Sequence, residues 1–233
     1  MIFKKRTLNI AFSDKVLEVG PGGSPHCRSD IFLEMEFIDE KEAAIQRSNS
    51  PRLETDKRII YYDGNNFPFK DKEFDYVICS HVVEHVPNVD KFISELERVA
   101  YKGYLEFPTI YYDYLYNIPT HLNLLCNKGN ILYYMTKDEA GLNKFKPVNN
   151  FFINTLELRY TSIIRDLKDY FFQGFEWKNK INIKKAHTIE EISLSTDDLL
   201  IVPKELKNKN KVSRELARFF KRLGIKKKFA EKK

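Results

Sequence analysis

The chain has 233 residues, of which 42% are hydrophobic and 31% charged, with 9 Gly and 9 Pro. It can therefore bury a sizeable core, and it is not a low-complexity disordered chain. No run of about 18 apolar residues occurs, and the basic start of the chain lacks an apolar stretch, which excludes a membrane-spanning helix and a secretory signal. We expect a cytoplasmic protein built around one domain.

The net charge of +6 is unevenly distributed. Residues 204–233 hold 13 Lys and Arg against 3 Asp and Glu, a net of +10, so residues 1–203 carry 6 − 10 = −4. A mildly acidic body argues against a nucleic-acid groove on it and assigns any affinity for polyanions or membranes to the basic segment. We expect one domain over residues 1–203 and a basic tail over residues 204–233.

Five short apolar runs predict strands in the first half of the chain. Most end in glycine, an acid or turn-forming residues, as buried parallel strands do where they enter loops. The expected strands are residues 15–20, 30–34, 58–62, 74–80 and 103–107. Their alternation with helices or long crossovers predicts an α/β fold with a doubly wound, mostly parallel sheet, whose ligand site lies at the carboxyl ends of the strands.

Helices and a hairpin are expected between and after these strands. Residues 40–47 have helical composition, and a second helix should follow an N-cap at Asn88 or Asp90. Residues 121–126 and 131–136 flank a turn and predict a hairpin that completes the sheet antiparallel. Residues 155–172 have near-helical spacing, with Gly174 at the position of a C-cap.

The segment V-L-E-V-G-P-G-G-S-P, residues 16–25, places glycines at the end of the first expected strand. Glycines there let a ligand approach backbone N–H groups closely, which suits a nucleotide cofactor. The dinucleotide pattern G-x-G-x-x-G is not met, because Pro25 replaces the third glycine. Glu34 also comes only 14 residues after Gly20, whereas the ribose-binding acid is expected about 20 residues on. A nicotinamide or flavin dinucleotide is therefore disfavoured.

Four motifs occur in order: E-V-G-P-G, Y-D-G-N-N-F-P-F, F-D-Y-V-I-C-S-H-V-V-E-H-V-P and G-Y-L-E-F-P. In this order the chain, over residues 15–108, resembles a class I S-adenosylmethionine-dependent methyltransferase of the small-molecule type common in bacterial biosynthetic clusters. The resemblance implies a Rossmann-like sheet of seven strands and S-adenosylmethionine as cofactor. It also implies methyl transfer to a small molecule or saccharide, which we expect to occur at oxygen.

The resemblance further implies which residues contact the cofactor. The glycine loop and the acid beneath it would wrap the amino-acid end, and the acid ending the second strand would bind the ribose hydroxyls. The acidic turn after the third strand would bracket the adenine, and two polar residues after the fourth would line the sulfonium side. In that order the residues are Glu18 with Gly20, Pro21, Gly22 and Gly23; Glu34; Asp63, Gly64 and Asn65; and Ser80 with His81.

We expect the residues that contact the methyl acceptor to follow the fourth and fifth expected strands. Methyl transfer is an in-line displacement, so a base is needed only if the nucleophile starts protonated. His85 is the first candidate base and His121 the second. Residues 111–152 should form one wall of the substrate site. The tyrosines near the start of this segment could line the bottom of a pocket for a sugar or an aromatic group. The insertion on the substrate side is placed at about residues 109–152.

The residues His81 to His85 also match the pattern H-x-x-E-H, in which two histidines on a helix bind zinc and the glutamate is the base. A zinc hydrolase is therefore one alternative. However, His81 directly follows a strand and Pro87 closely follows His85, which leaves no long helix to hold both imidazoles on one face. We therefore expect no metal ligands here. A non-catalytic scaffold that binds through its tail is the other alternative.

The basic tail contains an expected amphipathic helix over residues 213–224. Leu216, Phe219, Phe220 and Leu223 recur at helical spacing among basic residues. Such a helix could pack on the body or on a second copy, lie on an anionic membrane, or contact nucleic acid, which is the least favoured. A location peripheral to the inner face of the membrane is thus open.

Overall fold

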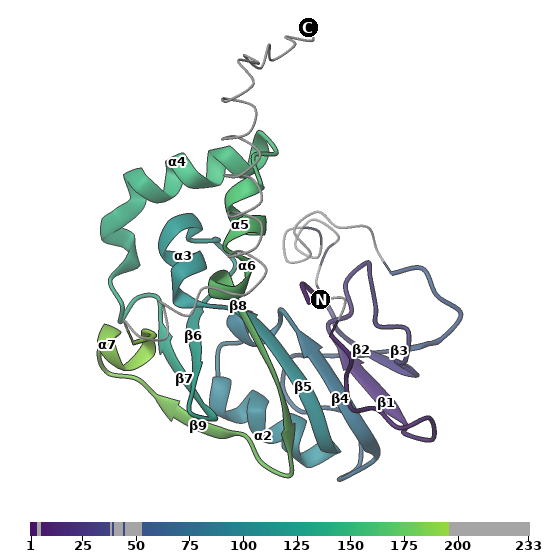
Figure 1. The fold of residues 1–233 in the computed structure, drawn as a ribbon. Coiled ribbons are helices and arrows are strands. Elements are labelled where there is room, and N and C mark those ends of the chain that lie inside the picture. The colour runs from purple at the N-terminus through teal and green to yellow at the C-terminus, as the bar shows by residue number, and fades with distance from the viewer. Residues whose placement is uncertain (4–5, 38, 40–43, 45–52, 196–233) are drawn as a thin grey trace, which may run out of the picture. The chain divides into compact units, whose positions relative to one another are not determined.

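The computed structural model describes residues 1–3, 6–37, 39, 44 and 53–195 (Figure 1). The expected helix over residues 40–47 and the whole basic tail lie outside the described residues, apart from Ala44. The compact unit considered below runs from Met1 to Leu194.

The main sheet has six strands in the order β3-β2-β1-β4-β5-β8 (Figure 1). The first five run parallel, and β8 is antiparallel to β5. This confirms the α/β fold with a mostly parallel sheet, although the described residues place six strands in it and not seven. The bounds are β1 Val16–Val19, β2 Ile31–Met35, β3 Arg58–Tyr62, β4 Phe74–Ser80, β5 Ala100–Pro108 and β8 Phe172–Lys178.

Both faces of the central strands are buried, which explains their continuous apolar runs. On one face Leu17, Val77 and Leu105 belong to a core that also contains the apolar side of α2 (Val89–Val99). On the other face the core is completed by Leu8 and Ile10 from the N-terminal segment. Helix α2 begins as expected at Asn88, whose side chain accepts the Lys91 N–H at 3.0 Å. Each such buried apolar side chain contributes about 1.5–3 kcal/mol to folding.

The expected hairpin forms, but it does not join the main sheet. Strands β6 (Asn123–Lys128) and β7 (Ile131–Thr136) pair antiparallel through a turn in which Gly129 and Asn130 have φ of 56° and 62°. β7 then pairs with β9 (Asn182–Lys185), giving a separate sheet of order β6-β7-β9. The prediction that this hairpin completes the main sheet is therefore wrong, because β8 occupies that edge.

The predicted helix over residues 155–172 is also wrong. The segment is divided among the end of α4 (Lys146–Glu157), α5 (Ser162–Asp166) and α6 (Lys168–Phe171), and β8 follows. Arg159 after α4 has φ of 60°, which ends the helix. Gly174 lies inside β8, where a Cβ would come within 2.1 Å of the Tyr104 hydroxyl. This glycine therefore permits a close approach across the sheet and is not a cap.

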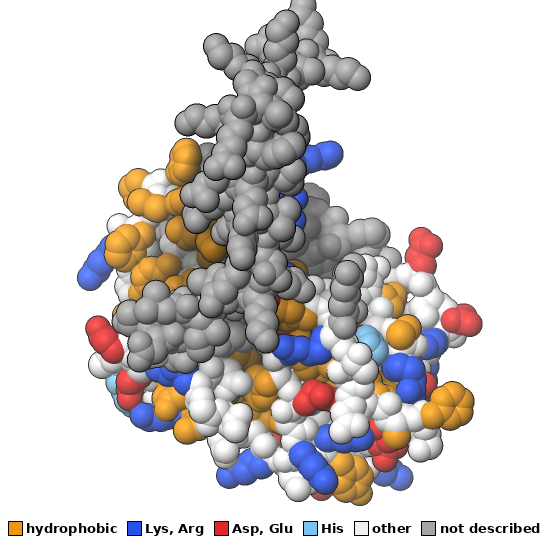
Figure 2. Space-filling view, viewed as in Figure 1, with side chains coloured by type: hydrophobic (Ala, Val, Ile, Leu, Met, Phe, Trp, Pro, Cys, Tyr) orange, Lys and Arg blue, Asp and Glu red, His pale blue; other side chains and the backbone are white. Residues whose placement is uncertain are grey.

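The remaining short elements lie around the hairpin. They are η1 (Val83–His85), α3 (Ile110–Tyr116), η2 (Leu142–Phe145) and α7 (Ile189–Ile192). Figure 2 shows apolar side chains gathered over α4, while positive and negative side chains are interspersed elsewhere on the coloured part of this face. Phe145, Val148 and Phe151, in η2 and α4, are exposed apolar residues. Among the described residues no helix is both long and apolar enough to span a membrane.

Candidate active site

The glycine loop follows β1 at the point where the strand order of the sheet reverses, the usual position of a ligand site in such folds. Gly20 and Gly22 have φ of 61° and 55°, which glycine adopts without steric cost. A Cβ on Gly20 would lie 2.4 Å from Val82 Cγ2. Glycine at this position therefore lets the loop lie directly against the segment that follows β4.

Glu18 lies within β1 and is 3% exposed. Its Oε2 accepts the His26 N–H at 2.8 Å and the Ser29 hydroxyl at 2.6 Å. Burial raises the pKa of Glu18, although these two hydrogen bonds oppose the shift. The carboxylate thus holds residues 26–29, just after the glycine loop, in place, and its role toward the cofactor stays a prediction.

The two acids expected at the ribose and adenine lie at neighbouring strand ends. Glu34 in β2 is in register with Tyr61 in β3, and Asp63 follows β3. The exposed Asp63 carboxylate accepts the Asn65 backbone N–H and side-chain amide, both at 2.9 Å, and these bonds lower its pKa. Gly64, with φ of 83°, lies against Met35, which is 42% exposed. The sequence analysis did not single out Met35, which offers an apolar wall beside this turn.

Ser80 and His81 are held by an acid that the sequence analysis missed. The Ser80 hydroxyl donates to Glu106 Oε1 at 2.9 Å, and His81 Nε2 lies 3.3 Å from the same oxygen. Glu106 is fully buried in β5 and also accepts the Tyr104 hydroxyl at 2.7 Å and the Ile2 N–H at 2.5 Å. A charged residue within the apolar run G-Y-L-E-F was the signal that could have revealed it.

His81 lies between two buried carboxylates. Its φ of 59° turns the backbone sharply after β4, and its Nδ1 lies 3.3 Å from Glu84 Oε1. Burial would lower the pKa of His81, but Glu106 and Glu84 raise it to about 9. Burial would likewise raise the pKa of Glu106, whereas His81, Tyr104 and the Ile2 N–H lower it to about 2. His81 is therefore an imidazolium at neutral pH.

The two candidate bases are brought together, although 36 positions separate them. The backbone N–H of Leu122 donates to the Glu84 carbonyl at 2.7 Å, and the Asn123 side chain donates to the Val86 carbonyl at 2.7 Å. These bonds tie the start of β6 to the segment after β4. The rings of His85 and His121 lie 4.8 Å apart, centroid to centroid, and perpendicular.

Each of these histidines has a partner at Nδ1. His85 Nδ1 lies 2.9 Å from the Thr120 carbonyl oxygen, so it donates there. His121 Nδ1 lies 2.9 Å from Asp113 Oδ1, a carboxylate with no exposed surface. In the neutral form of each ring, Nε2 then carries the lone pair. Burial lowers the pKa of His85, so its ring is neutral at neutral pH.

Glu84 lies beside this pair and is completely buried. Neither of its carboxylate oxygens accepts a hydrogen bond from the described residues. Burial would raise the pKa of Glu84, but the neighbouring His81 and then His85 and His121 lower it. One ligand atom each from Glu84, His85 and His121 lies within 4.8 Å of the others. His81 and His85 do not share a helix, since η1 is only three residues long, so the H-x-x-E-H geometry of zinc hydrolases is not formed.

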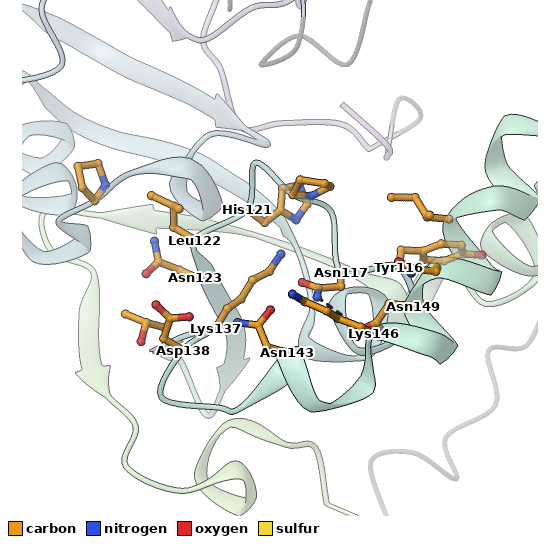
Figure 3. Close-up of a pocket in the computed structure, with 15 residues that line it drawn as sticks. Tyr116, Asn117, His121, Leu122, Asn123, Lys137, Asp138, Asn143, Lys146 and Asn149 are labelled. Carbon is orange, nitrogen blue, oxygen red and sulfur yellow. Dashed lines mark hydrogen bonds between the residues drawn. The ribbon is translucent and has the colours of Figure 1, made fainter.

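A cavity of about 570 Å³ opens beside His121 on the insertion (Figure 3). Its lining combines amide side chains and two lysines with apolar residues such as Leu122 and Ile153. Lys137 donates to the Ile118 carbonyl at 2.6 Å and lies 3.7 Å from Asp113, and burial lowers its pKa. The polar lining residues from the insertion include Asn117, His121, Asn123, Lys137, Asp138, Asn143, Lys146, Asn149 and Asn150.

Residues 17–105, which hold β1 to β5 and the segments that carry the site, match the family model described as a methyltransferase domain. Residues 17–105 are thereby identified as a methyltransferase domain, the kind of domain that the four motifs resemble. S-adenosylmethionine is the cofactor of this domain. The site-by-site contacts expected with it stay predictions, but the glycine loop, the acidic turn and the Ser80–His81 segment all follow strands at the carboxyl edge of the sheet.

The family model covers only part of the chain, and the chain matches less than a third of the length of its curated relative. An uncharacterised protein of Methanocaldococcus jannaschii, MJ1123, is 34% identical over 74 residues, which is 32% of this chain and 30% of that protein. A methyltransferase structure from Mesorhizobium loti shows 17% identity, covers 42% of this chain and 48% of its own, and has a TM-score of 0.31. A methyltransferase structure from Methanosarcina mazei shows 16% identity, and the match covers 52% of this chain and 69% of that chain with a TM-score of 0.32.

Proposed function

We propose that this protein transfers the methyl group of S-adenosylmethionine to an oxygen of a small-molecule or saccharide acceptor. One observation carries the proposal. Gly20 lies so close to Val82 that the cofactor loop contacts the segment that carries His81 and His85. A sulfonium methyl held at that loop would therefore face His85 and His121, which could act as general bases toward an acceptor hydroxyl.

The cavity on the insertion supports a polar acceptor. Amide and ammonium groups that line a cavity favour a ligand with several hydroxyl or anionic oxygens. His121 belongs both to this cavity and to the histidine pair. An acceptor bound there would thus reach the same residue that faces His85.

The first test is calorimetric titration with S-adenosylmethionine and S-adenosylhomocysteine, followed by methyl transfer to a panel of sugars and phenols. We expect about one cofactor per chain with micromolar affinity. His85→Ala should bind the cofactor like the parent and lower turnover about 100-fold or more, since general bases contribute factors of that size. The matched control is His187→Ala, since His187 is exposed and remote in sequence. Absence of cofactor binding would contradict the proposal, as would full turnover in His85→Ala.

We also propose that residues 204–233 provide peripheral contact with an anionic membrane at its cytoplasmic face. The support is their net charge of +10 and the expected amphipathic helix. The protein should bind vesicles that contain anionic lipid, more weakly as salt increases, and lose this binding when the chain is truncated after Pro203. Equal binding to neutral vesicles would contradict it.

A further inference from the structure

The cluster of Glu84, His85 and His121 has the composition of a metal site. We propose that these three side chains bind one divalent transition-metal ion, which holds the oxygen of the methyl acceptor. The second half of this proposal rests on the proposed function, whereas the first half does not. Two imidazoles and one carboxylate match the donor preference of ions such as Zn²⁺ and Mn²⁺ better than that of Ca²⁺ or Mg²⁺.

The donor atoms are already in position. One atom from each residue lies within 4.8 Å of the others, and His85 Nε2 lies 3.9 Å from Glu84 Oε1. Ligands of one ion at about 2.1 Å are separated by roughly 3–4 Å, so small side-chain rotations complete the site. Three protein ligands leave positions open for water or an acceptor oxygen.

The surrounding groups orient the three ligands. His85 and His121 both use Nδ1 to donate, to the Thr120 carbonyl and to Asp113 respectively, which points each Nε2 lone pair inward. This carbonyl or carboxylate support is what metal-bound histidines receive in proteins. Glu84 Oε1 lies 3.3 Å from His81 Nδ1 and forms an ion pair with it when His81 is protonated. The cluster therefore has both ligands and the partners that fix them.

The burial of Glu84 supports the metal site independently of the positions of the donor atoms. A carboxylate with 0% exposure and no hydrogen bond from the described residues is costly unless a strong cation compensates it. His81 compensates only in part, because Glu106 shares it. A divalent ion at the cluster would satisfy the carboxylate.

The ion would change what the histidines do. A nitrogen that ligates a metal cannot take a proton, so His85 and His121 would act through the ion and not as bases. An acceptor hydroxyl bound to the ion loses its proton to water more readily. Its oxygen then bonds to the methyl carbon, the bond from carbon to sulfur breaks, and the sulfonium becomes the thioether S-adenosylhomocysteine.

The test uses the full chain, stripped with a chelator and dialysed, in the absence of S-adenosylmethionine. Titration with Zn²⁺ and Mn²⁺ by calorimetry, with metal content by mass spectrometry, should show one ion per chain. Co²⁺ should give a visible absorption spectrum that Zn²⁺ abolishes. His121→Gln and Glu84→Gln should each lower the affinity at least 10-fold, whereas the control His187→Gln should not.

A variant that keeps all three ligands guards against misfolding. Asp113→Asn removes the negative charge that supports His121 and that also lies 3.7 Å from Lys137. It should weaken metal binding about 10-fold while circular dichroism shows a folded protein. Binding of no ion by the parent, or equal binding by parent and ligand variants, would overturn the proposal. If the protein binds S-adenosylmethionine but no metal ion, the proposed function stands and this inference is overturned. If it binds a metal ion but not the cofactor, the metal site stands and the proposed function is contradicted.

Discussion

Polar side chains find their partners differently in two regions of this protein. We call the ends of β1 to β3 with their loops the cofactor edge, and the surroundings of η1 and α3 the acceptor side. Around β1 to β3 the polar side chains are satisfied locally, as when Asp63 binds Asn65 and Glu18 binds the end of its own loop. Around η1 and α3 polar side chains meet across elements, in the pairs of His81 with Glu106 and His121 with Asp113. Substitutions should therefore act on local loop geometry in the first region and on stability and chemistry in the second.

This difference has a physical consequence. A turn closed by its own neighbours forms whenever its short segment folds, and its polar groups remain near water. Charges buried between distant elements become favourable only once the whole structure has formed, and removing one partner leaves the other uncompensated. The acceptor side is thus the more sensitive to single changes.

The largest expected effect is on the acceptor side, at Glu106. Glu106→Gln should lower the free energy of unfolding by about 3 kcal/mol at pH 7, because the half-buried His81 imidazolium loses its fully buried carboxylate partner. The pKa of Glu106 is lowered from 4.5 to about 2, so its charge stabilises the fold above pH 4.5, and this contribution disappears as the pH falls toward 2. The difference between parent and variant should shrink over that range in urea unfolding.

The control for Glu106→Gln is Glu157→Gln at an exposed position on α4. It should leave the unfolding midpoint unchanged. If both variants unfold alike at pH 7, the buried network contributes nothing and the contrast between the two regions fails.

The next effect is on the cofactor edge, at Gly20. Gly20→Ala should cost about 2 kcal/mol more than Gly129→Ala, since both glycines have positive φ but only Gly20 has a neighbour, Val82, within 2.4 Å of the added Cβ. Affinity for S-adenosylmethionine should fall at least 10-fold in Gly20→Ala and stay unchanged in Gly129→Ala. Equal stability costs for the two variants would show that the contact with Val82 is not tight.

The two regions also differ in how far the sequence predicts them. Four of the five parallel strands were predicted to within one residue, and β5 begins three residues before its predicted start. Buried strands between turn formers leave a strong local pattern. The hairpin was predicted as well, since Gly129 and Asn130 supply the positive φ it needs. Its partner could not be, because β9 lies some 46 positions beyond β7 and no local signal specifies that pairing.

The candidate site follows the same rule. The glycine loop and the acidic turn are contiguous motifs and were recognisable. Glu106 and Asp113 support His81 and His121 through contacts that only the folded chain creates. The proximity of His85 to His121 likewise depends on the bond from Leu122 to the Glu84 carbonyl, which no spacing along the chain reveals.

The smallest effect is expected at Asp63, where the polar contacts are local and exposed. Asp63→Ala should weaken binding of S-adenosylmethionine about 10-fold, because the adenine amine loses its acceptor and the turn loses two hydrogen bonds, while the thermal midpoint should hardly move. Asp63→Asn separates these two causes, because it keeps an acceptor for the Asn65 N–H. If Asp63→Asn binds the cofactor about as tightly as the parent, the loss in Asp63→Ala comes from the turn. If it binds as weakly as Asp63→Ala, the loss comes from the missing carboxylate. Unchanged affinity in Asp63→Ala would remove this turn from the cofactor site and leave the glycine loop as the support for the cofactor edge.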